Sequence, residues 1–144
     1  TYLVGFPGET DGEHEAMLAF MDRIGFDYTS VFSFSPEEGT RAVRLDGQID
    51  DETKRERTQA AVDLAEALGF AATAARVGQT AEVIVDGIEE TDEGYELIGH
   101  AWFQAPDSDG AVHLDAEEAA VGDVLTAEFT DSFCYELVGR VVKE

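Results

Sequence analysis

Positive charge is scarce in this sequence of 144 residues. Lys and Arg together number 9 against 32 Asp and Glu, which gives a formal net charge of −23. Proteins bind nucleic acids mainly through cationic side chains that release counterions from phosphates, and acidic membrane surfaces attract proteins in the same way. The composition therefore disfavours both a nucleic acid and a membrane surface as the partner.

Cysteine and long apolar runs are scarce as well. Cys134 is the only cysteine, which excludes an internal disulfide, a multi-cysteine zinc site and an iron–sulfur site built by this chain alone. We expect Cys134, between Phe133 and Tyr135, to be a small buried hydrophobe. No apolar stretch approaches the roughly 20 residues of a membrane-spanning helix, and no basic and then apolar leader opens the chain. We therefore expect a soluble, cytoplasmic protein.

The first residues predict a strand, a turn and a helix. Tyr2–Val4 form an apolar strand that runs into the turn 5–8 (Gly-Phe-Pro-Gly). Thr10 and Glu13 have the spacing of a capping box, and Gly25 is placed to end the helix. Helical spacing also relates the apolar residues Met17, Phe20, Met21 and Ile24. Because natural chains seldom open in mid-strand, we interpret the sequence as an excised piece.

A second strand and a long helix complete the first half. The strand is expected within 27–34, with Phe32 and Phe34 on one face and Val31 on the other. The helix is expected from residue 50 or 51 to about residue 75, with Ala61, Leu64, Ala65 and Leu68 on its apolar face. Two parallel strands alone leave apolar edges. Either further strands are missing, or the piece hides this surface by self-association.

The apolar period changes from 3.6 to 2 after residue 76, which predicts two domains, 1–76 and 77–144. Five short candidate strands follow, separated by Gly, Asp and Pro turns: 79–86, 95–101, 111–114, 124–130 and 135–142. This spacing is typical of a small closed barrel of the oligonucleotide-binding (OB) type. The predicted fold class is an α/β strand–helix–strand–helix portion followed by an all-β barrel.

Two segments resemble the radical S-adenosylmethionine methylthiotransferases. Residues 3–10 (LVGFPGET) and 32–40 (FSFSPEEGT) are similar to the fifth and sixth strands of that family's barrel with their following loops, and the remainder is similar to its TRAM domain. Residues 100–110 (HAWFQAPDSDG) are similar to the segment that marks the RimO branch, which modifies an aspartate of a ribosomal protein. His100 stands where the family usually has Arg.

The resemblance implies a fold, cofactors and a role for four residues. It implies the end of a radical S-adenosylmethionine barrel, with S-adenosylmethionine and [4Fe–4S] clusters in the full-length parent. Gly5, Phe6, Phe34 and Ser35 would lie near the adenosyl group. The alternative for the 5–8 turn alone is an ordinary strand–helix connection. With one cysteine the chain cannot supply the three thiolates of the radical cluster, so we expect no catalytic residue here and no activity of the fragment alone.

The acidic residues indicate the partner. Residues 77–144 hold 17 Asp or Glu against Arg140 and Lys143, whereas residues 1–76 hold 15 acids and seven cations. OB-type barrels usually bind RNA through a basic groove with stacking aromatics, and this barrel would repel RNA. It suits a basic small-subunit ribosomal protein, as the resemblance also implies. The residues expected on the docking face are Trp102, Gln104, Asp107 and Asp109. Because Trp102 and Phe103 are neighbours in an expected strand, one of them should face the core and the other should face solvent.

Three alternatives stay open from the sequence. The chain could belong to the tRNA-modifying branch of the family, with an RNA-binding TRAM domain. It could be an acidic interaction module unrelated to methylthiolation. The acidity could also be generic, as in a salt-adapted proteome in which negative surface serves solubility.

The remaining polar residues predict no further chemistry. Adjacent loop residues rarely converge on one atom, so Glu37 and Glu38 are interpreted as a solvated turn rather than an acid–base pair. His14, His100 and His113 show no metal-ligand spacing with one another or with Cys134. We expect structural or surface roles for the three histidines.

Overall fold

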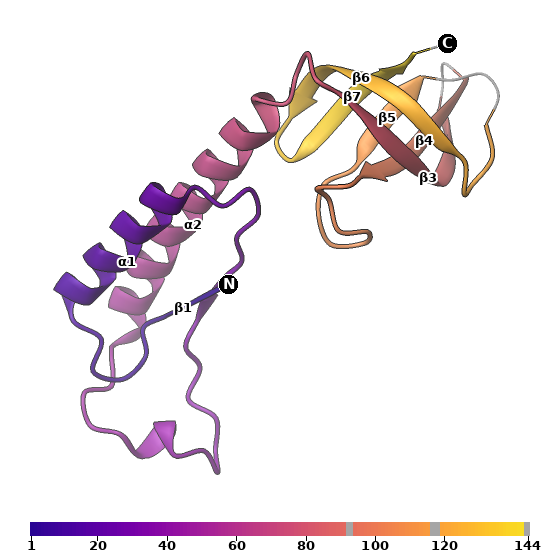
Figure 1. Ribbon diagram of the computed structural model, residues 1–144. Coiled ribbons are helices and arrows are strands. Elements are labelled where there is room, and N and C mark those ends of the chain that lie inside the picture. The colour runs from indigo at the N-terminus through magenta and orange to yellow at the C-terminus, as the bar shows by residue number, and fades with distance from the viewer. Residues whose placement is uncertain (92–93, 116–118, 143–144) are drawn as a thin grey trace. The chain divides into compact units, whose positions relative to one another are not determined.

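The computed structural model describes residues 1–91, 94–115 and 119–142 (Figure 1). The chain divides into two compact units, Thr1–Gly69 and Phe70–Glu144, which we describe separately. Within the described residues, no helix has the length and apolar character needed to cross a membrane.

The first unit is built on two parallel strands. Strand β1 (Tyr2–Val4) pairs with β2 (Val31–Ser33), and helix α1 (Asp11–Ile24) connects them. A short 3₁₀ helix (Ala42–Arg44) follows, and then α2 (Asp51–Ala74), whose last turn belongs to the second unit. The predicted order of strand, helix, strand and long helix is confirmed.

Helix α1 begins and ends at the residues that the sequence predicts. The Glu13 backbone N–H donates to Thr10 Oγ1 at 3.2 Å, and the Thr10 N–H donates to Glu13 Oε2 at 2.8 Å. Both halves of the capping box are therefore present. At the other end Gly25 adopts the left-handed conformation (φ 63°), and its N–H donates to the carbonyl of Met21 at 2.9 Å.

One face of the two-stranded sheet carries the core of this unit. Val4, Met21, Ala61 and Ala65 are buried together, so α1 and α2 both pack on the sheet, and Figure 1 shows the two helices side by side. Partly buried side chains surround this core: Tyr2, Met17, Leu18, Val31, Leu64 and Leu68. The predicted apolar face of α2 is confirmed.

The other face of the sheet has no cover among the described residues. Leu3 and Phe32 are register partners on β1 and β2, and these residues are 51% and 58% exposed. Strands of parallel sheets are normally covered on both faces. Phe20 and Ile24 on α1 are also exposed. The apolar surface expected from the short strand count is therefore present.

The second unit is a closed barrel of five strands. They are β3 (Thr80–Thr91), β4 (Gly94–Ala101), β5 (Val112–Asp115), β6 (Val124–Phe133) and β7 (Glu136–Val141). The order around the barrel is β3-β4-β5-β7-β6, with β5 and β7 parallel and the other pairs antiparallel. The predicted five-stranded OB-like barrel is confirmed.

The barrel is filled by inward-facing side chains from all five strands. The buried core consists of Val83, Val85, Leu97, Ala101, Val112, Leu114, Ala127, Phe129 and Leu137. Register shifts lie between Val85 and Gly87 on β3 and between Phe129 and Asp131 on β6. Each shift interrupts the alternation of apolar and polar residues, and both strands continue beyond the ends predicted from that alternation.

Cys134 corrects one expectation. It lies between β6 and β7 with a positive φ of 52°, and its side chain is exposed rather than buried. A tight connection between antiparallel strands needs a residue with positive φ, and Cys134 takes that place. The side chain therefore points out of the hairpin although apolar neighbours flank it in sequence.

Candidate functional site

The first candidate region is the carboxyl edge of the parallel sheet. Because β1 and β2 run in the same direction, the segments after them, with Gly5, Phe6, Phe34 and Ser35, emerge at one edge. The Phe34 N–H donates to the carbonyl of Val4 at 2.8 Å. The rings of Phe6 and Phe34 meet edge to face with centroids 5.2 Å apart. The structure thus brings these four positions together, and residue Phe6 is 41% exposed.

Gly5 lies in a close packing position. Its φ is +78°, and a Cβ atom there would lie 2.5 Å from Cγ of Lys54. Its N–H donates to Glu9 Oε2 at 2.9 Å. A side chain at this position would displace Lys54 and strain the backbone, so the turn after β1 requires glycine.

Glu9 belongs to an ion-pair network that the sequence pattern did not reveal. The guanidinium of Arg57 donates to Glu9 Oε1 at 2.9 Å, to the Glu9 carbonyl at 3.0 Å and to Asp11 Oδ1 at 2.6 Å. The hydrogen bond with Asp11, and then Glu9, raises the pKa of Arg57. The network ties the turn after β1 to α2, and because its partners are far apart in sequence no local motif marks it.

The second candidate region is the loop 102–110 after β4. Gln104 is 4% exposed; its Oε1 accepts from the Ala101 N–H at 2.9 Å, and its Nε2 donates to the carbonyl of Gly110. The side chain therefore closes the loop from inside. This corrects the assignment of Gln104 to the docking face, because its amide already satisfies buried backbone groups.

The acidic residues of the same loop have separate roles. Asp109 Oδ2 accepts from the Ala105 N–H at 2.7 Å. Asp107 is exposed and adopts a positive φ of 65°. At Gly110 a Cβ atom would collide with the carbonyl oxygen of Tyr135. These contacts fix the loop conformation and leave the Asp107 carboxylate in solvent.

Trp102 is held on this loop as a residue that is 83% exposed. Its ring meets that of Phe103 edge to face at 5.5 Å, and Phe103 packs against the core residue Phe129 at 5.9 Å. The Arg76 guanidinium lies 3.6 Å from the Phe103 ring centre. Phe103 thus faces the core and Trp102 faces solvent, although both follow β4 in a turn instead of lying within a strand.

Positive charge is sparse on residues 77–142, and the one Lys or Arg side chain in this range is already paired. Arg140 is the only Lys or Arg within 77–142, and its guanidinium lies 2.9 Å from Glu128 Oε2. His100 Nδ1 lies 2.6 Å from Asp86 Oδ2. A continuous cationic groove cannot form on this stretch of the chain.

The other polar residues singled out in the sequence lie apart from these regions. Glu37 and Glu38 are in an exposed turn, where Glu37 accepts from the hydroxyl of Ser35 at 3.1 Å. His113 lies between two carboxylates, 3.2 Å from Glu96 and 3.3 Å from Glu136. Across residues 1–91, 94–115 and 119–142, no three His, Cys, Asp or Glu side chains form a group able to hold a metal ion.

Comparison with known proteins places this architecture in a family. Residues 77–142 match the model of the TRAM domain. A ribosomal protein uS12 methylthiotransferase RimO of Bdellovibrio bacteriovorus is 41% identical over 144 residues, which is 99% of this chain. Over its whole length this chain matches the C-terminal part of RimO methylthiotransferases. RimO proteins of Trichlorobacter lovleyi and Syntrophotalea carbinolica are each 38% identical, over 142 and 144 residues.

The match covers a part of RimO. The chain spans 31% of the length of each of these three relatives. Its content, a strand–helix region followed by a TRAM barrel, corresponds to a C-terminal RimO segment. The resemblance seen in the sequence is confirmed over the whole chain.

The residues present fit one implied cofactor and not the other. An exposed aromatic ring, as at Phe6, suits the adenosyl group of S-adenosylmethionine, whereas the close approach at Gly5 is already filled by the Lys54 side chain. A [4Fe–4S] cluster with one open iron needs three thiolates, and Cys134 is the only cysteine. Ligands for such a cluster would have to come from outside these 144 residues.

Proposed function

We propose that this chain serves in a radical S-adenosylmethionine methylthiotransferase that modifies an aspartate of a basic small-subunit ribosomal protein, and that its barrel docks that protein. The relatives are named for ribosomal protein uS12. The proposed division is 1–76 for the end of the catalytic barrel and 77–144 for the TRAM domain. The proposed cellular compartment is the cytoplasm.

One observation carries the docking proposal. The barrel has the fold of an RNA-binding module, but its single cation within 77–142, Arg140, is bound to Glu128. RNA affinity depends on several cationic contacts with phosphates. An acidic surface attracts a cationic protein and accelerates its association. The alternative partner, tRNA, would need a cationic groove on the barrel, and residues 77–142 offer none.

Within the docking face, Trp102 is proposed as the anchor. A rigid aromatic side chain in a fixed loop contributes to binding without a large ordering cost. Asp107 and Asp109 lie later on the same loop and are proposed to contribute negative charge, although Asp109 also accepts from the Ala105 N–H. Gln104 is proposed only to hold the loop.

For the first unit we propose a supporting role. Gly5, Phe6, Phe34 and Ser35 would complete the adenosyl pocket of the whole enzyme at the carboxyl edge of its strands, where barrel enzymes place their sites. No residue of this chain is proposed to act in catalysis. The chain alone is therefore expected to be inactive.

Calorimetric titration with purified uS12 at about 0.1 M salt tests the docking role. A barrel variant replaces exposed acids with amides: Glu82→Gln, Asp107→Asn and Asp115→Asn. The matched control makes the same charge change in the first unit: Asp22→Asn, Glu56→Gln and Glu66→Gln. We expect at least about a tenfold weaker affinity for the barrel variant and little change for the control. Equal losses in both would indicate general acidity and contradict docking by the barrel.

A further inference from the structure

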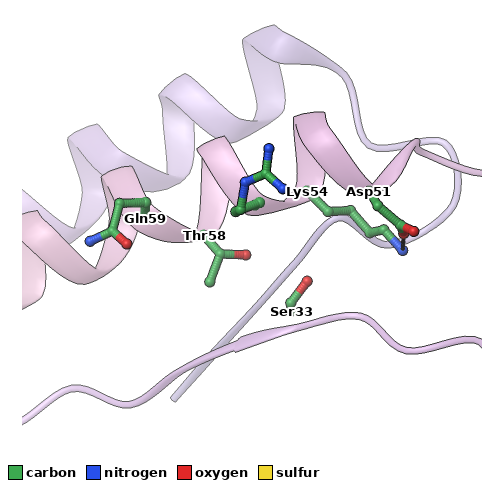
Figure 2. Close-up of a pocket in the computed structure, with 6 residues that line it drawn as sticks. Ser33, Asp51, Lys54, Thr58 and Gln59 are labelled. Atoms are coloured by element: carbon green, nitrogen blue, oxygen red, sulfur yellow. Dashed lines mark ion pairs between the residues drawn. The ribbon is translucent and has the colours of Figure 1, made fainter.

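A cleft lined by polar and charged residues lies between the end of β2 and the first turns of α2, on the face of the sheet that the helices cover. Its volume is about 280 Å³. Figure 2 shows Ser33 on β2 across from Thr58 and Lys54 on α2. The lining residues are Ser33, Asp51, Lys54, Arg55, Thr58 and Gln59.

The cleft begins where the apolar core ends. Lys54, Thr58, Ala61 and Ala65 follow one another at helical spacing on one face of α2. Ala61 and Ala65 are buried in the core, whereas the two positions nearer the start of the helix carry polar side chains. Ser33 is the last residue of β2, and sheets with parallel strands bind ligands at their carboxyl ends.

Two hydroxyl groups at the cleft lack partners in the described structure. Thr58 Oγ1 is buried and makes no hydrogen bond, although a helical threonine commonly bonds to the carbonyl one turn earlier. No hydrogen bond of Ser33 Oγ is found among the described residues either. A buried hydroxyl without a partner is destabilising unless a ligand or water satisfies it.

The cleft also collects positive charge in a chain that has little. Lys54 and Arg55 are two of its nine cations. The Lys54 side chain is only 12% exposed, and its Nζ lies 2.8 Å from Oδ1 of Asp51, which is 96% exposed. Arg55 has no ion pair within the described part of the chain, whereas neighbouring Arg57 is bound to Glu9 and Asp11.

We propose that this cleft binds a phosphate oxyanion. It offers two cationic groups and two free hydroxyl donors, and one phosphate group has enough acceptor oxygens for all of them. Asp51 is the single carboxylate in the lining, and it is exposed at the rim. The phosphate could be the free anion or the phosphoryl group of a nucleotide. The proposal does not rest on the docking role of the barrel.

The test is an NMR titration of the 144-residue chain with inorganic phosphate, at constant ionic strength set with chloride. We expect saturable shifts of the backbone amides at Ser33, Lys54 and Thr58. Thr58→Val, which keeps the side-chain shape, should weaken binding at least about fivefold because one donor is lost. Thr58→Ser should retain binding.

A charge-matched pair of variants separates a specific site from general attraction. Arg55→Gln should weaken phosphate binding at least about fivefold, whereas Arg44→Gln, outside the cleft, should change it less than about twofold. Repeating the titration with AMP identifies the source: tighter binding of AMP assigns the site to a nucleotide, and equal or tighter binding of phosphate assigns it to the free anion. Absence of saturable shifts with both ligands, or equal effects of the two Arg variants, would overturn the proposal.

Discussion

Arg57 on α2 donates a 2.9 Å hydrogen bond to Oε1 of Glu9, 48 residues earlier in the chain. Both side chains are largely buried, with exposures of 11% and 14%. Because Glu9 also accepts from the N–H of Gly5, the pair fixes the turn after β1 against α2. Arg57 on α2 thus holds in place the turn that is proposed to face an adenosyl group.

Replacing Arg57 should destabilise the first unit. Arg57→Leu leaves the Glu9 carboxylate in a mostly buried place without its charged partner, and we expect a loss of about 2 kcal/mol in the free energy of unfolding. Urea denaturation followed by circular dichroism measures this. Arg41→Leu, at an exposed position, serves as the control and should change stability by less than about 0.5 kcal/mol. Equal effects of the two substitutions would refute the role of the pair.

The capping box of α1 should contribute a pH-dependent stability. Hydrogen bonds from the backbone and the hydroxyl of Thr10 lower the pKa of Glu13 from its ordinary 4.5. A carboxyl whose pKa is lower in the folded state stabilises the fold above its unfolded pKa, and this contribution is lost as pH falls through the folded pKa. Below pH 4.5 the free energy of unfolding of the native chain should therefore fall more steeply with pH than that of the Glu13→Gln variant. Parallel acid-unfolding curves would contradict this.

The loop that carries Trp102 should depend on glycine at position 110. Gly110→Ala places a Cβ atom against the carbonyl oxygen of Tyr135, which must force the loop and the β6–β7 hairpin apart. We expect a loss of about 2 kcal/mol or more, measured by thermal unfolding. Gly87→Ala, at a strand position where a Cβ atom meets nothing within 4 Å, should cost less than half as much. A Gly110→Ala chain with native stability would show that the loop is not fixed there.

The uncovered face of the parallel sheet should promote self-association of this chain. Leu3 and Phe32 are adjacent and half exposed, and apolar patches of this kind favour contact between copies. Sedimentation velocity should show association that rises with concentration, and a double variant Leu3→Lys and Phe32→Lys should shift it to at least about tenfold higher concentration. The control is the double variant Val121→Lys and Val124→Lys, at two exposed positions on the barrel, which should leave the association unchanged. A chain that stays monomeric at every concentration measured would contradict this prediction.

Local signals made much of the fold predictable. The capping box at Thr10, the glycine at 25 and the alanine stripe of α2 each depend on residues within a few turns of one another, and all three are present in the structure. The five strands of the barrel are predictable for the same reason, because the alternation of apolar and polar residues is also a local pattern. Their ends were missed on β3 and β6 because register shifts at Val85/Gly87 and Phe129/Asp131 break the alternation on which the prediction depended.

Features that depend on distant contacts or on backbone conformation were not predictable. Cys134 was expected to be buried because its neighbours are aromatic, but the hairpin gives it a positive φ and turns it outward. The sequence predicts Gln104 on the docking face, yet its amide makes hydrogen bonds inside the loop. The polar cleft beside Ser33 could not be predicted, since no motif relates it to Thr58.

Trp102 is the only tryptophan of the chain, so its fluorescence reports on the proposed docking loop directly. The most direct test is to titrate the chain with uS12 and, separately, with tRNA at about 0.1 M salt, while recording this emission. We predict a saturable change with uS12 that weakens as salt rises, and none with tRNA. Trp102→Phe, followed by calorimetry, should bind uS12 more weakly and keep its stability. Tight tRNA binding that changes the Trp102 emission and falls steeply with salt would contradict the account.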